Sequence, residues 1–89
     1  MIETMIDTSQ VKRTNPESVT GLQIDLKRLE YLLNYTKPRG ANAVRVIVEE
    51  GAYLDGFRFI IEYGQRIGDK LVPKGRVIER YSEELQYSR

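Results

Sequence analysis

The sequence contains no cysteine, no histidine and no tryptophan. Without cysteine there can be no disulfide, thiolate metal site, cysteine nucleophile or thiolate-held iron–sulfur cluster. Without histidine, the usual zinc sites, the Ser-His-Asp triad and the commonest general base are excluded as well. The 14 basic and 13 acidic residues give a net charge of +1, which provides no general attraction to nucleic acid or acidic membranes. A chain of 89 residues has the size of one domain.

Targeting and membrane signals are also missing. The first residues lack the basic and apolar regions of a secretion signal. No apolar run approaches the roughly 20 residues that span a bilayer, and the longest, Val44 to Val48, is interrupted by Arg45. We therefore expect a cytoplasmic protein, and the lack of cysteine fits a reducing compartment.

A helix is predicted to begin after a segment rich in turn formers. Asn15 is a typical N-cap, Pro16 suits the first helical position, and Glu17 is an acid in the first turn. The capping-box spacing of Thr20 and Gln23 offers a second possible start. We expect residues 1–15 to be loosely structured, with a short strand as the alternative.

One apolar stripe defines the helix, with apolar residues recurring at steps of three and four. It comprises Val19, Leu22, Leu26, Leu29 and Leu33. We expect this stripe to pack on the core rather than on a partner helix. The alternation of Leu22, Ile24 and Leu26 is also compatible with a strand, so the first turn is open. Pro38 and a left-handed Gly40 should end the helix.

Two period-2 segments around residues 44–49 and 57–63 predict a β-hairpin. Its register follows from matching apolar with apolar and basic with acidic residues. The predicted pairs are Val48 with Phe59, Val46 with Ile61 and Val44 with Tyr63 on one face, and Glu49 with Arg58, Ile47 with Ile60 and Arg45 with Glu62 on the other.

The C-terminal part is predicted to form two short strands around a turn at Pro73, running to about Arg80, and a short helix from Ser82. A helix through Ile78 and Leu85 is the alternative. The expected fold class is α+β, with one long N-terminal helix packed on a small antiparallel sheet with a central hairpin, and a short C-terminal helix. Residues 16–89 form the single domain.

The segment from Gly56 to Ile60 partly matches the aromatic strand of RNA-recognition sheets. Phe57 and Phe59 share a face with the core residues of the hairpin, so we expect them in the core, with a base-stacking platform as the alternative. Basic residues form the candidate surface for an anionic partner, or else a solvated surface. They are Lys37, Arg39, Arg66, Lys70, Lys74, Arg76 and Arg80.

The element order and the glycine-bounded hairpin resemble the A-type iron–sulfur cluster carrier (HesB-like) domain. The matching segments are 43–51, 56–62, 68–72, 75–78 and 82–87. The resemblance covers roughly residues 16–87. It implies a scaffold in which a cysteine in the glycine-flanked loop and a Cys-Gly-Cys near the C-terminus bind iron or a cluster.

This chain departs from the family at those ligands. The loop between Gly51 and Gly56 has no cysteine, and the 89 residues end before the position of the terminal motif. We therefore expect no cofactor and no bound metal. Tyr53, Leu54 and Asp55 occupy the loop, where the two apolar side chains are candidates for anchoring a partner protein. The alternative is that they fold back on the core.

No constellation of catalytic residues emerges, so we expect a protein that is not an enzyme. The leading hypothesis is a non-catalytic protein-binding or structural module on a HesB-like scaffold that has lost its cluster ligands. A weak nucleic-acid-binding protein using the basic segment 66–80 is the alternative, and a carboxylate-based enzyme is the least supported. Small domains often associate to bury more surface, which favours a homodimer.

Overall fold

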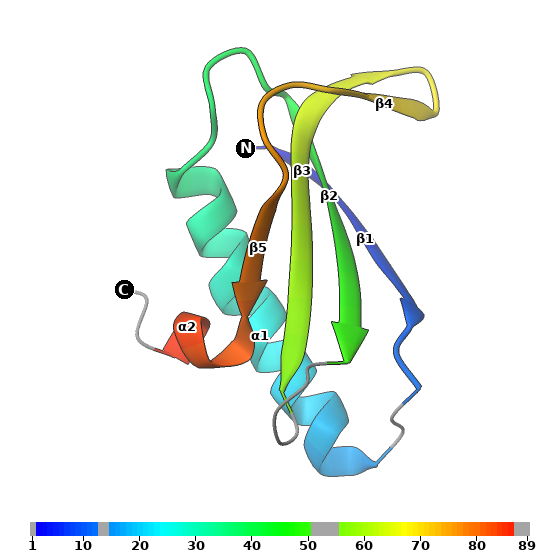
Figure 1. Ribbon diagram of the computed structural model, residues 1–89, viewed down its shortest axis with the longest axis vertical. Coiled ribbons are helices and arrows are strands. Elements are labelled where there is room, and N and C mark those ends of the chain that lie inside the picture. Colours follow the sequence, from blue (N-terminus) through cyan, green and yellow to red (C-terminus); the bar gives the residue numbers. More distant parts are fainter. Residues whose placement is uncertain (1, 13–14, 51–55, 87–89) are drawn as a thin grey trace.

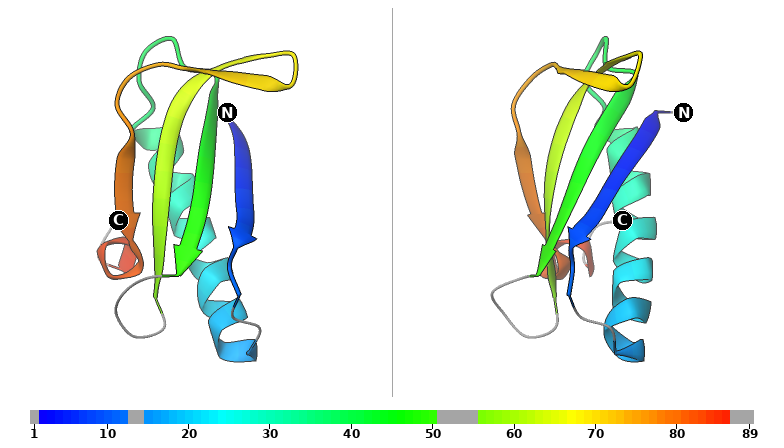
Figure 2. Two further views of the ribbon diagram at one scale, coloured as in Figure 1. Left: turned by 45° about the vertical axis from the view of Figure 1, so that its right-hand side comes forward. Right: turned by 90° about the vertical axis from the view of Figure 1, so that its right-hand side faces the viewer.

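The computed structural model describes residues 2–12, 15–50 and 56–86. They form a two-layer α+β fold in which α1 covers one face of a five-stranded mixed sheet (Figures 1 and 2). The elements are β1 (Glu3–Gln10), α1 (Pro16–Tyr35), β2 (Ala43–Glu50), β3 (Phe57–Ile67), β4 (Lys70–Pro73), β5 (Ile78–Tyr81) and α2 (Ser82–Gln86). Neither α1 nor α2 combines the length and apolar character that a bilayer-crossing helix needs.

The sheet is mixed rather than antiparallel, because β1 pairs in parallel with β2. A parallel pair requires a long crossover connection, and α1 provides it. The structure also differs from the expectation of a loosely structured segment over residues 1–15. Ile2 is buried, and Ile6 lies beside Val46 on the helix side of the sheet, so this segment joins the sheet as β1. The short strand considered as the alternative is the outcome.

The central hairpin of β2 and β3 has the predicted register at all six pairs. Its helix-side residues are fully buried, including Val46 and Phe59. On the opposite face, Arg45 forms an ion pair with Glu62 at 2.5 Å, and Arg58 forms one with Glu49 at 3.1 Å. The two faces therefore enforce the same register by different forces, apolar burial on one and charge pairing on the other.

The helix begins where Asn15 predicts. The Asn15 Oδ1 accepts a hydrogen bond from the Ser18 amide at 2.8 Å, so the start at Thr20 is wrong. Of the apolar stripe, Leu29 and Leu33 are buried against the sheet, whereas Val19 is 42% exposed. The helix thus packs through its middle and C-terminal turns.

The end of α1 is held by the sheet below it. The Tyr63 hydroxyl donates a hydrogen bond to the Leu33 carbonyl at 3.0 Å and lies 3.2 Å from Thr36 Oγ1. Gly40 follows with a φ of +86°, which is the predicted left-handed turn. The last carbonyls of the helix are therefore capped by a buried tyrosine of β3.

The strands β4 and β5 both pair antiparallel with β3, on the edge that β2 leaves free. They run one after the other along that edge, and α2 begins at Ser82 as predicted, so the alternative helix through Ile78 is wrong. Phe57 and Phe59 are 2% and 0% exposed. They belong to the core, and the alternative of a base-stacking platform is wrong.

Gly64 marks the place where β4 crosses very close to β3. A Cβ at Gly64 would lie 2.2 Å from the Val72 carbonyl oxygen and 3.1 Å from Leu71 Cγ. A side chain of any size therefore forces the two strands apart.

We expect Gly64→Ala to lower the free energy of unfolding by about 1–3 kcal/mol, as overpacked sites do. Gly21→Ala is the matched control, since nothing lies within 4 Å of its Cβ position in α1. That substitution should raise the free energy of unfolding by up to about 1 kcal/mol. Urea denaturation followed by far-UV circular dichroism measures both, and equal effects would contradict the close approach.

Candidate functional site

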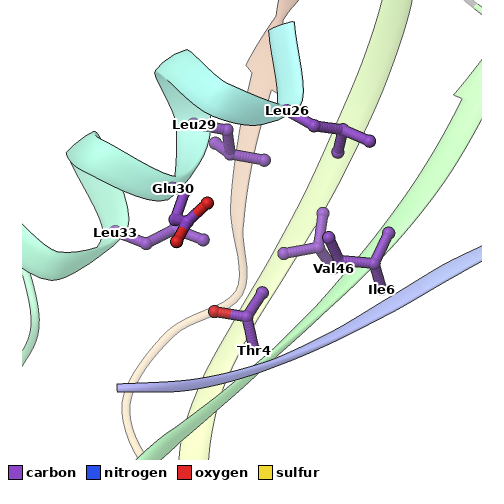
Figure 3. Close-up of a pocket in the computed structure, with 7 residues that line it drawn as sticks. All are labelled: Thr4, Ile6, Leu26, Leu29, Glu30, Leu33 and Val46. Atoms are coloured by element: carbon purple, nitrogen blue, oxygen red, sulfur yellow. The ribbon is translucent and has the colours of Figure 1, made fainter. Parts of the chain in front are cut away.

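An apolar cleft of about 140 Å³ lies between α1 and the outer strand β1. Its lining residues are Thr4 and Ile6 of β1, Val46 of β2, and Leu26, Leu29, Glu30 and Leu33 of α1. In Figure 3 the three leucines point from the helix toward Val46 and Ile6, with Glu30 and Thr4 among them. The cleft exists because α1 covers the middle of the sheet and leaves the helix side of β1 only partly covered, with Ile6 47% exposed.

The outer edge of β1 has main-chain groups without a neighbouring strand. The Glu3 amide donates to the Asn42 carbonyl next to β2 at 3.1 Å. Because successive residues of a strand point their N–H and C=O groups to opposite sides, Thr4 and Ile6 point theirs away from β2. The open edge and the apolar cleft therefore meet at the same two residues.

Both ends of this edge are already occupied. At the start, the Ile2 amide donates to Asn34 Oδ1 of α1 at 3.1 Å. At the other end, the Val11 amide donates to the Thr8 carbonyl at 3.0 Å, just after an irregularity between Asp7 and Gln10. The available stretch is consequently short, from Thr4 to Thr8.

The predicted anionic-partner residues divide into two groups. Lys37 and Arg39 lie in the loop between α1 and β2, and Lys74 and Arg76 lie between β4 and β5. Figure 1 shows both loops at the same end of the molecule. The Lys74 Nζ lies 2.9 Å from the position that a Cβ on Gly40 would occupy. We call these four residues the basic end, and no ion pair engages them among the described residues.

The other three predicted cations do not join them as free charges. Arg66 forms an ion pair with Glu3 of β1, and its amide bonds Asn42 Oδ1 at 3.0 Å. Arg80 lies along β5, with its Nε 4.0 Å from the Glu84 carboxylate. Lys70 begins β4, beyond the turn from β3. The predicted partner anchors Tyr53, Leu54 and Asp55 lie outside the described residues.

Asp25 is the one buried carboxylate of the described part of the chain, and it lies on α1 where α2 packs. Burial raises its pKa above the ordinary value of 3.8, while a hydrogen bond from Ser82 and the charge of Arg28 oppose the rise. Ser82 also accepts from the Phe57 amide at 2.6 Å. Asp25 thus belongs to the contact that joins α2 to the body of the protein.

The sequence pattern did not predict the cleft. Ile6 was assigned to the loose segment, and Glu30 was assigned to the solvent face of the helix. The signal present in the sequence was the spacing of Ile2 and Ile6, which fits a strand with one side facing the helix. Within the described residues, no group of three or more histidine, cysteine, aspartate and glutamate side chains is placed to hold a metal ion.

No protein-family model, curated protein or solved structure matches this chain.

The buried carboxylate of Asp25 generates a prediction about pH. Because its pKa is higher in the folded than in the unfolded chain, the folded state binds the proton more tightly. The ionised form therefore destabilises the fold above the raised pKa, and this penalty disappears as the pH falls through that pKa to below 3.8.

We expect Asp25→Asn to be more stable relative to the wild type at pH 7 than at pH 3.5, with about 1.4 kcal/mol for each unit of pKa difference. Urea denaturation at the two pH values measures the change. Glu17→Gln, on an exposed first-turn acid, is the control. A stability difference that grows as the pH falls would contradict the assignment.

Proposed function

We propose that this chain is a non-catalytic binding module that acts by contact with other proteins, and that the contact is made along β1. The observation that carries the proposal is the coincidence of the open edge of β1 with the apolar cleft at Thr4 and Ile6. The proposed occupant is an extended protein segment that adds to the sheet as a further strand.

Strand addition fits this edge for two reasons. The outward main-chain groups of Thr4 and Ile6 supply hydrogen bonds to any extended backbone, independent of its sequence. Alternate side chains of the added strand then fall on the helix side, next to Ile6 and the leucines of α1, where apolar residues are favoured. The edge gives affinity and the cleft gives selectivity for alternating apolar residues.

The described part of β1 carries none of the common devices that block edge pairing at its centre. Proline and lysine are absent from Glu3–Gln10, and the irregularity lies beyond Asp7. The resemblance to the HesB-like domain supports the same kind of role, since we propose a scaffold of that type whose ligand cysteines are missing and which works by contact instead.

Peptides selected from a random displayed library on the immobilised protein should alternate apolar and polar residues. Ile6→Lys should weaken their binding by about 10-fold or more, because burying a side chain of this size contributes about 1.5–3 kcal/mol. Val77→Lys is the matched control, since Val77 is 54% exposed and lies beside the opposite edge of the sheet.

Fluorescence anisotropy of the labelled peptides measures the affinities, and amide hydrogen exchange locates the contact at Thr4 and Ile6. Selected peptides that lack alternation, or that bind both variants equally, would reject β1 as the site.

A second candidate function is weak binding of nucleic acid at the basic end. The observation that favours it is the convergence of Lys37 and Arg39 with Lys74 and Arg76 from two separate loops, with no ion pair among the described residues. Unpaired cations at one end attract phosphate groups and release their counterions on binding.

For the basic end, we expect the affinity for a single-stranded oligonucleotide to fall with added salt, with a logarithmic slope of about −0.7 for each phosphate neutralised. The double variant with Lys37→Glu and Lys74→Glu should abolish the binding, whereas Lys27→Glu on α1 should leave it nearly unchanged. Binding that does not depend on salt, or no binding in dilute buffer, would reject this candidate.

A further inference from the structure

The edge of β1 is self-complementary, and we propose that its partner is β1 of a second copy of this chain, paired antiparallel across a two-fold axis with Ile6 opposite Ile6. This inference rests on the proposed function and names the occupant of the same edge. It turns two sheets of the described fold into one continuous sheet.

The hydrogen-bonding direction of β1 restricts the possible registers. In an antiparallel pair, residues that point their main-chain groups outward must face one another. On β1 those residues are Thr4, Ile6 and Thr8, since Glu3 is bonded toward β2. A two-fold axis can therefore pass at Thr4, Met5 or Ile6 within the available stretch.

Two of these three registers meet an obstacle. With the axis at Met5, Glu3 of each copy stands opposite Asp7 of the other, which brings like charges together on both sides of the axis. With the axis at Thr4, Ile6 must pair with Ile2, whose amide is already bonded to Asn34 Oδ1 at 3.1 Å.

The register with the axis at Ile6 avoids both obstacles. It sets Thr4 opposite Thr8 and Met5 opposite Asp7, so no like charges face one another. The ladder then spans the available stretch from Thr4 to Thr8 and stops before the irregularity that precedes Gln10. Each of these cross-strand pairs joins residues that suit a sheet, including an aliphatic pair at the centre.

The side chains support the same arrangement. Both copies of Ile6 meet on the helix side at the axis, where each also borders the cleft of the other copy. A side chain that is 47% exposed in one copy thereby becomes covered in the pair. On α1, Glu30 lines the cleft and Lys27 lies one turn earlier, so the two-fold axis sets a flank with opposite charges against its own inverse.

The absence of cysteine makes this register directly testable, because a single introduced cysteine is the sole thiol of each chain. We expect Ile6→Cys to form a disulfide-linked dimer rapidly under mild oxidation at micromolar concentration. Tyr35→Cys, at a position 82% exposed on α1, reports the rate of random collision. Met5→Cys should crosslink no faster than that control, and faster crosslinking there would overturn the register.

Light scattering after size-exclusion chromatography tests the dimer without any new thiol. The wild type should have twice the mass of one chain, and Ile6→Lys should raise the dissociation constant by about 10-fold or more. Thr4→Pro is a second variant, because it removes an outward N–H and leaves the bonds to β2 in place. Far-UV circular dichroism confirms that both variants are folded.

A wild-type monomer at millimolar concentration would overturn self-pairing, and so would a dimer that both variants leave intact. The proposed function is judged separately. If selected peptides bind the wild type and not Ile6→Lys while the protein is monomeric, the edge binds other proteins and self-pairing alone is wrong. If neither peptides nor a second copy bind, both proposals fail.

Discussion

The antiparallel pairing of β2 with β3 is the constraint on which the rest of the structure depends. Its helix-side residues build most of the core floor, and its opposite face is closed by the ion pairs of Arg45 with Glu62 and of Arg58 with Glu49 and Glu79. A slip by one residue would expose the core and bury the charges together. Every other strand is added to one side of this pair.

The same pair positions both candidate sites. Tyr63 of β3 caps the end of α1 and so sets where the loop carrying Lys37 and Arg39 leaves the helix. Gln65 continues this connection by donating to the Gly40 carbonyl at 2.9 Å, and the close approach at Gly64 brings the later loop toward it. The basic end is thus a product of core packing, although none of its side chains is in the core.

The edge of β1 arises from the topology. Because β1 reaches the sheet through a parallel crossover and no later strand of the described chain returns to its outer side, its main-chain groups are left unpaired. Since α1 has to cover the wide aromatic and aliphatic surface of β2 and β3, it leaves the helix side of β1 partly open. One packing compromise therefore produces both the edge and the cleft.

The sequence by itself determined the features that depend on near neighbours. Asn15 and Pro16 set the start of α1, Gly40 set the turn after it, and the charges of Arg45 and Arg58 selected the hairpin register, because caps, turns and cross-strand pairs of a short hairpin are local interactions. The tertiary structure alone decided that β1 joins in parallel, that β4 and β5 share one edge of β3, and which cations gather at one end. Those arrangements join residues far apart in the chain, and their free energy comes from burial between elements, which no local pattern encodes.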